Sequence, residues 1–193
     1  MSTISYIEES AAGFDTIPLE SRLITDRKIF IEGALTTETA VDFTKQMMYL
    51  SKSDEPVYIY INSTGGEVNA GLAIYDIIQG FQGEIQMYCI GQASSMAAVL
   101  LAAGQKGKRF ILPHSLVMIH EVLLGRGISG SATSISRISQ SVMETRGIVN
   151  GILSKHTGKS IELINKSTSF DNCMNATEAV KFGICDKIID TIF

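Results

Sequence analysis

The chain has 193 residues, of which 45% are hydrophobic and 19% are charged, and its formal net charge is −4 at pH 7. This length suits a single domain with a sizeable core, and the composition excludes a disordered chain. The negative charge, with no run of lysine and arginine, argues against a nucleic-acid-binding protein.

Cysteine usage and the N-terminal sequence indicate the compartment. Cys89, Cys173 and Cys185 are odd in number, lie in or beside apolar runs and lack metal-ligand spacing. They are typical of reduced thiols in the cytoplasm. The N-terminus has neither the basic start nor the apolar stretch of a secretion signal. We therefore expect a cytoplasmic protein that does not insert into a membrane.

The first third of the chain predicts one strand followed by one helix. Residues 1–27 are weakly patterned, and we expect their beginning to be mobile. Residues 28–32 alternate as a strand does, and Gly33 marks a turn. Thr36 or Thr37 is placed to cap a helix that runs to about Ser51.

Two strand–turn–helix units follow in succession. Residues 57–62 predict a strand, residues 63–66 a glycine-rich turn, and the helix after them runs through Leu72 and Ile78. The second unit occupies residues 85–104, and Leu116–His120 predicts another strand. Alternating units of this kind favour an α/β fold with parallel strand pairing and right-handed crossovers.

A long amphipathic helix is predicted from Ser131 to Thr157, ended by Gly158. At a length of about 40 Å it exceeds what a small core covers, so we expect part of its apolar stripe to meet another subunit. The alternative is a helix lying across its own sheet. A helix near Ser160, a short helix between Asn175 and Gly183, and a strand at residues 184–189 complete the pattern.

Two serines lie where the strand of the second unit gives way to its helix. Met96–Ala103 is apolar on every side, too short to span a bilayer, and so typical of a buried helix. Ser94 and Ser95 precede it, where unpaired N–H groups favour negative charge. A nucleophilic serine whose intermediate carries an oxyanion suits this position. The alternative is an ordinary helix cap.

Only three histidines are available as a general base. His156, at the polar end of the long helix, is expected to be solvated, and His114 follows a proline in a turn. His120 ends an apolar strand before a glycine-rich loop, where functional groups often lie, although a core histidine is the alternative. Gly65 and Gly66 allow backbone N–H groups to point at a ligand, or they form a plain turn.

Four segments in order resemble the proteolytic subunit of the Clp protease family, ClpP, from about Glu20 to Ile189. They are YIYINSTGGEVNAGLAIYD, CIGQASSMAAVLLAAGQKGKRF, LPHSLVMIH and DNCMNATEAVKFGICD. The resemblance implies an α/β fold of the ClpP/crotonase type, a spiral of βαβ repeats that forms a head with a projecting helical handle. The single domain would span residues 1–193, with an N-terminal axial segment (1–20), a head (about 20–122 and 158–193) and a handle (about 123–157).

The resemblance also assigns roles to residues. The nucleophile maps to Ser95, the histidine of the Met-Ile-His run to His120, and the aspartate to Asp171. The oxyanion donors map to the backbone N–H groups of Gly66 and Met96. A peptide substrate would add as a strand between two segments, whose residues are Gly65, Glu67, Val68, Leu124 and Gly125.

The implied activity is serine endopeptidase cleavage of unfolded proteins and peptides, as part of protein quality control. Two heptameric rings would enclose the active sites in a tetradecamer, fed by an AAA+ unfoldase of the ClpX, ClpA or ClpC type. Neither a cofactor nor a metal is implied. The unfoldase would dock on an apolar cleft that maps to Tyr58, Tyr60, Tyr88, Ile90, Phe110, Leu112 and Ile189.

Two departures from the family pattern keep alternatives open. Ser169-Phe170 stands where many members have an Asp-Arg pair that bridges the rings, and Glu121-Val122 replaces the usual Gln-Pro after the histidine. The first departure motivates a non-catalytic or weakly active ring partner of a second ClpP-type subunit. A crotonase-type acyl-CoA enzyme shares the spiral fold, but the serine, histidine and aspartate are surplus to that chemistry.

Overall fold

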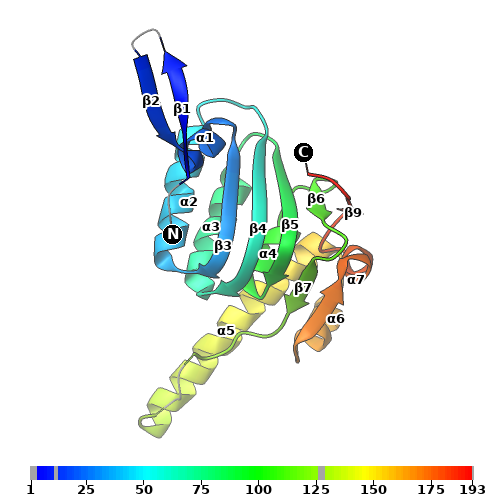
Figure 1. The fold of residues 1–193 in the computed structure, drawn as a ribbon. Coiled ribbons are helices and arrows are strands. Elements are labelled where there is room, and N and C mark those ends of the chain that lie inside the picture. Colours follow the sequence, from blue (N-terminus) through cyan, green and yellow to red (C-terminus); the bar gives the residue numbers. More distant parts are fainter. Residues whose placement is uncertain (1–3, 11–12, 126–128, 193) are drawn as a thin grey trace.

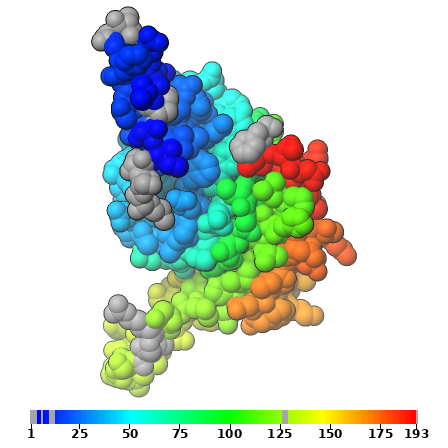
Figure 2. Space-filling view, viewed as in Figure 1, coloured from blue at the N-terminus to red at the C-terminus, as the bar shows by residue number. Residues whose placement is uncertain are grey.

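The computed structural model describes residues 4–10, 13–125 and 129–192. These residues form a body built on one sheet, from which a hairpin and part of a long helix project (Figures 1 and 2). Residues 1–3 and 11–12 of the expected axial segment, and residues 126–128 of the expected handle, lie outside the described residues.

The N-terminal region is more ordered than its sequence predicts. Strands β1 (Ser5–Ser10) and β2 (Gly13–Pro18) pair as an antiparallel hairpin, and α1 (Leu19–Thr25) follows. The weak pattern of residues 1–27 therefore did not indicate these elements. The hairpin stands clear of the body (Figure 1), and β2 is almost wholly exposed, so neither of its faces needs the apolar alternation that marks a half-buried strand.

The body contains a seven-stranded sheet, and the predicted parallel pairing is confirmed. Its main path runs β3-β4-β5-β6-β9, all in parallel. The end of β5 turns away from β6 and pairs with β7, which pairs antiparallel with β8. The strands are β3 (Lys28–Leu35), β4 (Val57–Gly66), β5 (Ile85–Ser94), β6 (Arg109–Ile111), β7 (Leu116–Ile119), β8 (Asn172–Asn175) and β9 (Lys187–Ile188).

Strand β9 is shorter than the strand expected at residues 184–189. It pairs only Lys187 with Phe110 and Ile188 with Ile111. Ile184 and Cys185, before the strand, are buried, and backbone N–H groups of Asp186 and Ile189 donate to the carbonyls of Arg109 (2.7 Å) and Ile111 (3.0 Å). The predicted strand is therefore present in its second half, whereas burial explains the apolar character of residues 184–185.

Helices cover one face of the sheet and leave the other open (Figure 1). The covering helices are α2 (Thr37–Leu50), α3 (Val68–Gly80) and α4 (Met96–Ala102). Alternate strand residues point toward these helices, and those such as Ile59 and Met87 are fully buried. Every residue of α4 is buried, which confirms the prediction from its uniformly apolar sequence.

The long helix α5 (Ala132–Thr157) is packed at one end only. It ends at Gly158, as predicted, with this glycine in the left-handed conformation, and the side chain of Ser131 caps its start. Val149 and Leu153 are buried in the body, whereas residues 132–141 are exposed on the part that projects (Figure 1). Helices α6 (Ile161–Ser167) and α7 (Ala176–Phe182) complete the body.

Candidate active site

Ser95 lies in a strained turn between β5 and α4. Its φ and ψ angles are 55° and −125°, a combination that non-glycine residues rarely adopt. The N–H of Ser95 donates to the carbonyl of Met118 (2.8 Å), and its own carbonyl accepts from Ala98 in the first turn of α4. Strain of this kind persists only where surrounding contacts enforce it, and such residues cluster at functional sites.

The two candidate serines occupy different environments. Ser94 is the last residue of β5, is almost fully buried and lies opposite Met118 in β7. Its Oγ is 3.5 Å from the side-chain oxygen of Gln92. Ser95 instead lines a cavity, so it is the serine that a ligand in that cavity reaches.

The glycine pair at the end of β4 supports the serine turn directly. A Cβ on Gly65 would lie 2.5 Å from the carbonyl oxygen of Ser94 and 2.7 Å from the Cβ of Ser95. Gly65 also has φ of +82°, so both space and conformation require glycine. Residues 63–66 are not the free turn expected from the sequence, because they remain in β4 and pair with β3 as far as Leu35.

A cavity of about 110 Å³ brings several predicted residues together. Ser95, Met96, His120 and Gly66 all line it, although they come from three different parts of the chain. Apart from Ser95, His120 and Glu121, its wall is glycine and apolar side chains. The lining residues are Gly66, Val68, Ser95, Met96, Val99, Ile119, His120, Glu121, Val122, Leu123, Val149 and Leu153.

Other predicted substrate-binding residues lie outside this wall. Gly65 lies behind the serine turn, and Glu67 begins α3, where its carboxylate accepts a hydrogen bond from Thr37 (3.1 Å). Leu124 and Gly125 lie on the exposed connection that leads from β7 to α5.

Asp171 lies near His120 without a hydrogen bond to it. In the antiparallel register of β7 and β8, Ile119 pairs with Asn172. This pairing brings His120, which follows β7, beside Asp171, which precedes β8. The distance from His120 Nδ1 to Asp171 Oδ1 is 3.9 Å, beyond hydrogen-bond length. The side chain of Asp171 is 74% exposed, and His120 Nδ1 is buried without a hydrogen-bond partner among the described residues. A shift of about 1 Å would join the two groups.

The other histidines lie elsewhere. His114 is exposed in a turn, as predicted. The expectation that His156 is solvated is wrong, because its Nε2 lies 3.1 Å from the hydroxyl of Tyr75 and its ring is partly buried. Desolvation, together with the nearby charges of Lys155 and Arg109, lowers the pKa of His156. His120 is therefore the histidine that shares a cavity with Ser95.

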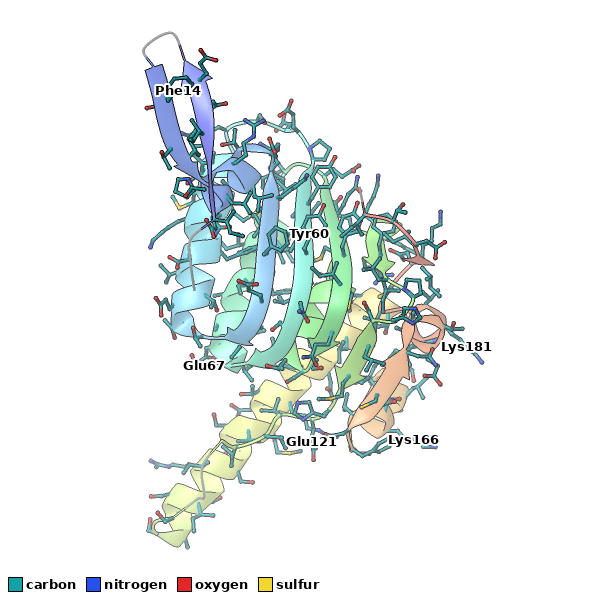
Figure 3. The ribbon with its side chains drawn as sticks, viewed as in Figure 1. Phe14, Tyr60, Glu67, Glu121, Lys166 and Lys181 are labelled. Carbon is teal, nitrogen blue, oxygen red and sulfur yellow. The ribbon has the colours of Figure 1, made fainter. Side chains whose placement is uncertain are left out.

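The residues predicted to form a docking cleft lie along the open face of the sheet, where Figure 3 labels Tyr60. Tyr60, Tyr88 and Phe110 stack across three strands, with ring centroids 5.1 Å apart at each step. The stack continues onto Phe30 of β3, at 5.0 Å from Tyr60. Sequence reasoning missed Phe30, although its place in the alternation of residues 28–32 gave a usable signal.

The remaining residues of that set surround the stack. Tyr58, Ile90, Leu112 and Ile189 are all partly buried. Desolvation raises the pKa of Tyr60, and the neighbouring Tyr58 raises it further. This surface is thus aromatic, neutral and partly accessible.

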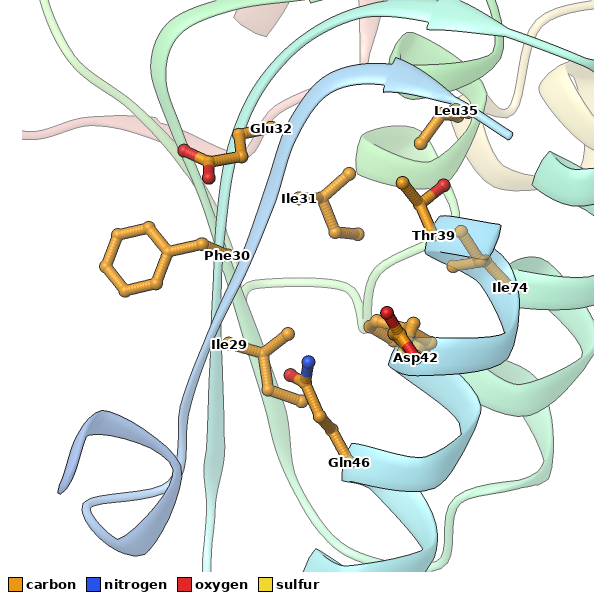
Figure 4. Close-up of a pocket in the computed structure, with 10 residues that line it drawn as sticks. Ile29, Phe30, Ile31, Glu32, Leu35, Thr39, Asp42, Gln46 and Ile74 are labelled. Carbon is orange, nitrogen blue, oxygen red and sulfur yellow. The ribbon is translucent and has the colours of Figure 1, made fainter. Parts of the chain in front are cut away.

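A second cavity, of about 190 Å³, lies between β3 and α2 (Figure 4). Ile29, Ile31 and Ile74 point into it, while Asp42 and Gln46 lie at its α2 side. It contains no serine, cysteine or histidine, so it lacks the nucleophile and base that the first cavity has.

Among the described residues, no group of three or more histidine, cysteine, aspartate or glutamate residues is arranged to hold a metal ion. Within the same residues, no helix combines the length and hydrophobicity that crossing a membrane requires.

The chain was also compared with known protein families. The sequence model of the Clp protease family matches residues 12–192, which include the serine turn, both strands beside the cavity and all of α5. The mixed α/β architecture and mostly parallel sheet agree with the fold of that family. The chain therefore belongs to the Clp protease family and is a peptidase of the ClpP type.

Proposed function

We propose that this chain is a serine endopeptidase subunit with Ser95 as nucleophile, His120 as general base and Asp171 as the group that orients the base. One observation carries the proposal: a strained serine at a strand–helix junction and a histidine line the same cavity. Family membership supports the same reaction class.

The chemistry follows from the arrangement of the cavity. His120 accepts the proton of the Ser95 hydroxyl as its oxygen attacks the substrate carbonyl, and an acyl-enzyme forms as the leaving amine takes that proton. The backbone N–H groups of Gly66 and Met96 are suited to bind the oxyanion, since Met96 is the first residue of α4 and its N–H has no partner within the helix. Losing one such donor costs about 3 kcal/mol of transition-state stabilisation.

The substrate is an extended peptide. The end of β4 and the connection at Leu124–Gly125 flank the cavity, and a peptide between them would add as a strand. The cavity wall, built largely from Val68, Val99 and Leu153, suits an apolar side chain at the cleavage site.

The subunit acts in a cytoplasmic chamber of two heptameric rings, fed with unfolded protein by an AAA+ unfoldase. Ile135, Ile138 and Met143 are exposed on the projecting part of α5, which supports burial of that part against another copy. The aromatic stack from Phe30 to Phe110 supports docking of the unfoldase on the open face of the sheet.

A fluorophosphonate probe tests the proposed nucleophile. We expect the assembled protein to be labelled, the Ser95→Ala variant not to be labelled, and the neighbouring Ser94→Ala variant to keep its labelling. Labelling that survives Ser95→Ala would assign the nucleophile to another residue. No labelling of the unaltered protein in any assembled form would refute the proposal.

A second function, a weakly active ring partner of another ClpP-type subunit, is favoured by the gap of 3.9 Å between His120 and Asp171. Its test combines native mass measurement with hydrolysis of a short peptide on the same sample. If the purified chain is inactive alone but a mixture with a paralogue cleaves the peptide, this second function is supported. Activity of the chain alone, in an assembly of one subunit type, excludes it.

A further inference from the structure

An ion pair links the residue after His120 to the long helix. Arg146 Nε on α5 lies 3.2 Å from Glu121 Oε2. The side chain of Arg146 is 23% exposed and that of Glu121 is 44% exposed. Among the described residues of the connection from His120 to α5 (121–125, 129 and 130), this is the one ion pair, and none of them makes a hydrogen bond to another element.

The pair lies where α5 leaves the body. Residues 132–141 are exposed, whereas Val149 and Leu153, one and two turns after Arg146, line the cavity that contains Ser95. Glu121 also lines this cavity, and Figure 3 shows it beside α5. One stretch of helix therefore supplies both lining residues of the cavity and the charge that pairs with another lining residue.

The charges act here without a directional bond. Arg146 Nε is shielded from solvent and has no hydrogen-bond partner among the described residues, although the carboxylate of Glu121 is close. The attraction is therefore mainly Coulombic, and partial burial makes it stronger than that of a fully exposed pair. A Coulombic tie holds a segment in place while it tolerates small movements.

His120 needs such a tie because the Asp171 carboxylate is near its ring but is not hydrogen-bonded to it in this structure. With Nδ1 buried and 3.9 Å from the carboxylate, the imidazole is positioned by the backbone on either side of it. On one side lies β7, and on the other lies Glu121. Displacements of about 1 Å at a reacting group reduce rates by up to 100-fold.

We propose that Glu121 and Arg146 are positioning residues, which hold the connection after His120 against α5 and so set the place of the imidazole relative to Ser95. The inference rests on the proposed serine peptidase function. A change in the direction of α5 is then transmitted to the base through this pair.

A double-mutant cycle with Glu121→Gln and Arg146→Met in the full chain tests the proposal. Each variant should lower kcat for a short peptide about tenfold, with KM changed less than twofold, and the double variant should lose no more than either single one. Arg146→Lys, which keeps the charge, should retain most of the activity. Arg22→Met, which removes an exposed ion pair with Asp26 away from both the cavity and α5, is the control and should leave kcat unchanged.

Two kinetic outcomes overturn the inference: single variants with an unchanged kcat, or losses that multiply in the double variant. If the unaltered protein does not react with a fluorophosphonate, the proposed function fails, and the pair is judged without activity. Amide hydrogen exchange at residues 117–125 then decides. Faster exchange in Glu121→Gln and Arg146→Met supports the pair, and unchanged exchange overturns it.

Discussion

Ser95 and Asp171 are both proposed to act through His120, yet their surroundings differ. The serine turn is fixed by the Met118 carbonyl, by the close approach of Gly65 and by a fully buried helix. Asp171 is 74% exposed and precedes a strand of only four residues. It approaches the cavity residue His120 to 3.9 Å.

The difference follows from where each residue lies relative to the core. A φ of 55° at Ser95 is costly, and it is held because β4, β7 and α4 all pack around it. An exposed carboxylate has no comparable packing, so its position is free to adjust by the small distance that a hydrogen bond requires. The proposed nucleophile is thus preorganised by the body, whereas the proposed orienting group is not.

Replacing Asp171 sharpens this comparison most. Asp171→Asn should lower kcat by about 10³- to 10⁴-fold, because an amide cannot stabilise the imidazolium or select its tautomer. Its free energy of unfolding should change by less than about 0.5 kcal/mol, since the side chain is exposed. Peptide hydrolysis and urea unfolding measure the two effects, with the exposed Asp190→Asn as control. Loss of less than tenfold in kcat would remove Asp171 from the mechanism.

Asp186→Asn should produce the opposite pattern, a large loss of stability with activity kept per folded molecule. Asp186 holds the buried Arg109 through Nε (2.9 Å) and a terminal nitrogen (2.6 Å), and Arg109 in turn binds the carbonyl of Ala102 at the end of α4. Leaving the guanidinium buried and unpaired costs about 3–5 kcal/mol. Urea unfolding at pH 7 measures this cost, and the exposed Asp42→Asn should show almost none.

The pair of Asp186 and Arg109 also predicts how the free energy of unfolding depends on pH. Desolvation raises the pKa of Asp186, but hydrogen bonds and charge from Arg109 outweigh it, so the folded-state pKa lies below the ordinary value. The stabilisation that ionised Asp186 gives to the folded state is complete above its unfolded-state pKa of about 4. It is lost as pH falls through the lower folded-state pKa. Asp186→Asn should therefore lose less stability between pH 4 and pH 2 than the unaltered protein. An equal loss would show that other groups cause it.

Gly65→Ala tests whether the serine turn is as tightly fixed as its contacts indicate. The added methyl group would meet the backbone of Ser94 and the side chain of Ser95, so we expect kcat/KM to fall about 100-fold. Gly107 is a matched control, because its φ of +85° resembles the +82° of Gly65 while a Cβ there meets nothing within 4 Å. Gly107→Ala should cost about 1 kcal/mol of stability and leave kcat/KM unchanged. Equal activity of the two variants would contradict the tight fit.

The smallest predicted effect concerns His156, whose ring is partly buried beside Tyr75, unlike the exposed Asp171. Its folded-state pKa is lowered by desolvation and by Lys155 and Arg109, so the unfolded chain binds a proton more readily. Its contribution to stability is present above the unfolded pKa of about 6.5 and is lost as pH falls through the folded value. His156→Gln should therefore show a smaller drop in Tm between pH 7.5 and 5.5. The exposed His114→Gln should behave like the unaltered protein, and an equal drop in both variants would exclude His156 as the cause.

Prediction from sequence worked where a pattern reports a local environment. The helix starts at Ser131 and near Ser160, the cap at Asn175, and the end of α5 at Gly158 were predicted because capping chemistry acts within a few residues. It failed at the N-terminal hairpin, which has no buried face to mark it, and it placed the start of β9 too early, because the buried Ile184 and Cys185 extend the apolar run before that strand.

The sequence by itself determined the alternation of strands and helices, the buried helix after Ser95, and the order of motifs that resembles the Clp protease family. Only the tertiary structure decided that Ser95, His120 and Gly66 share one cavity, that Asp171 stops 3.9 Å from the imidazole, and that Glu121 meets Arg146. The physical reason is the distance along the chain over which the deciding interactions act. Periodicity and capping are set by neighbours in the chain, whereas a site depends on how separate strands and helices pack, to within about 1 Å.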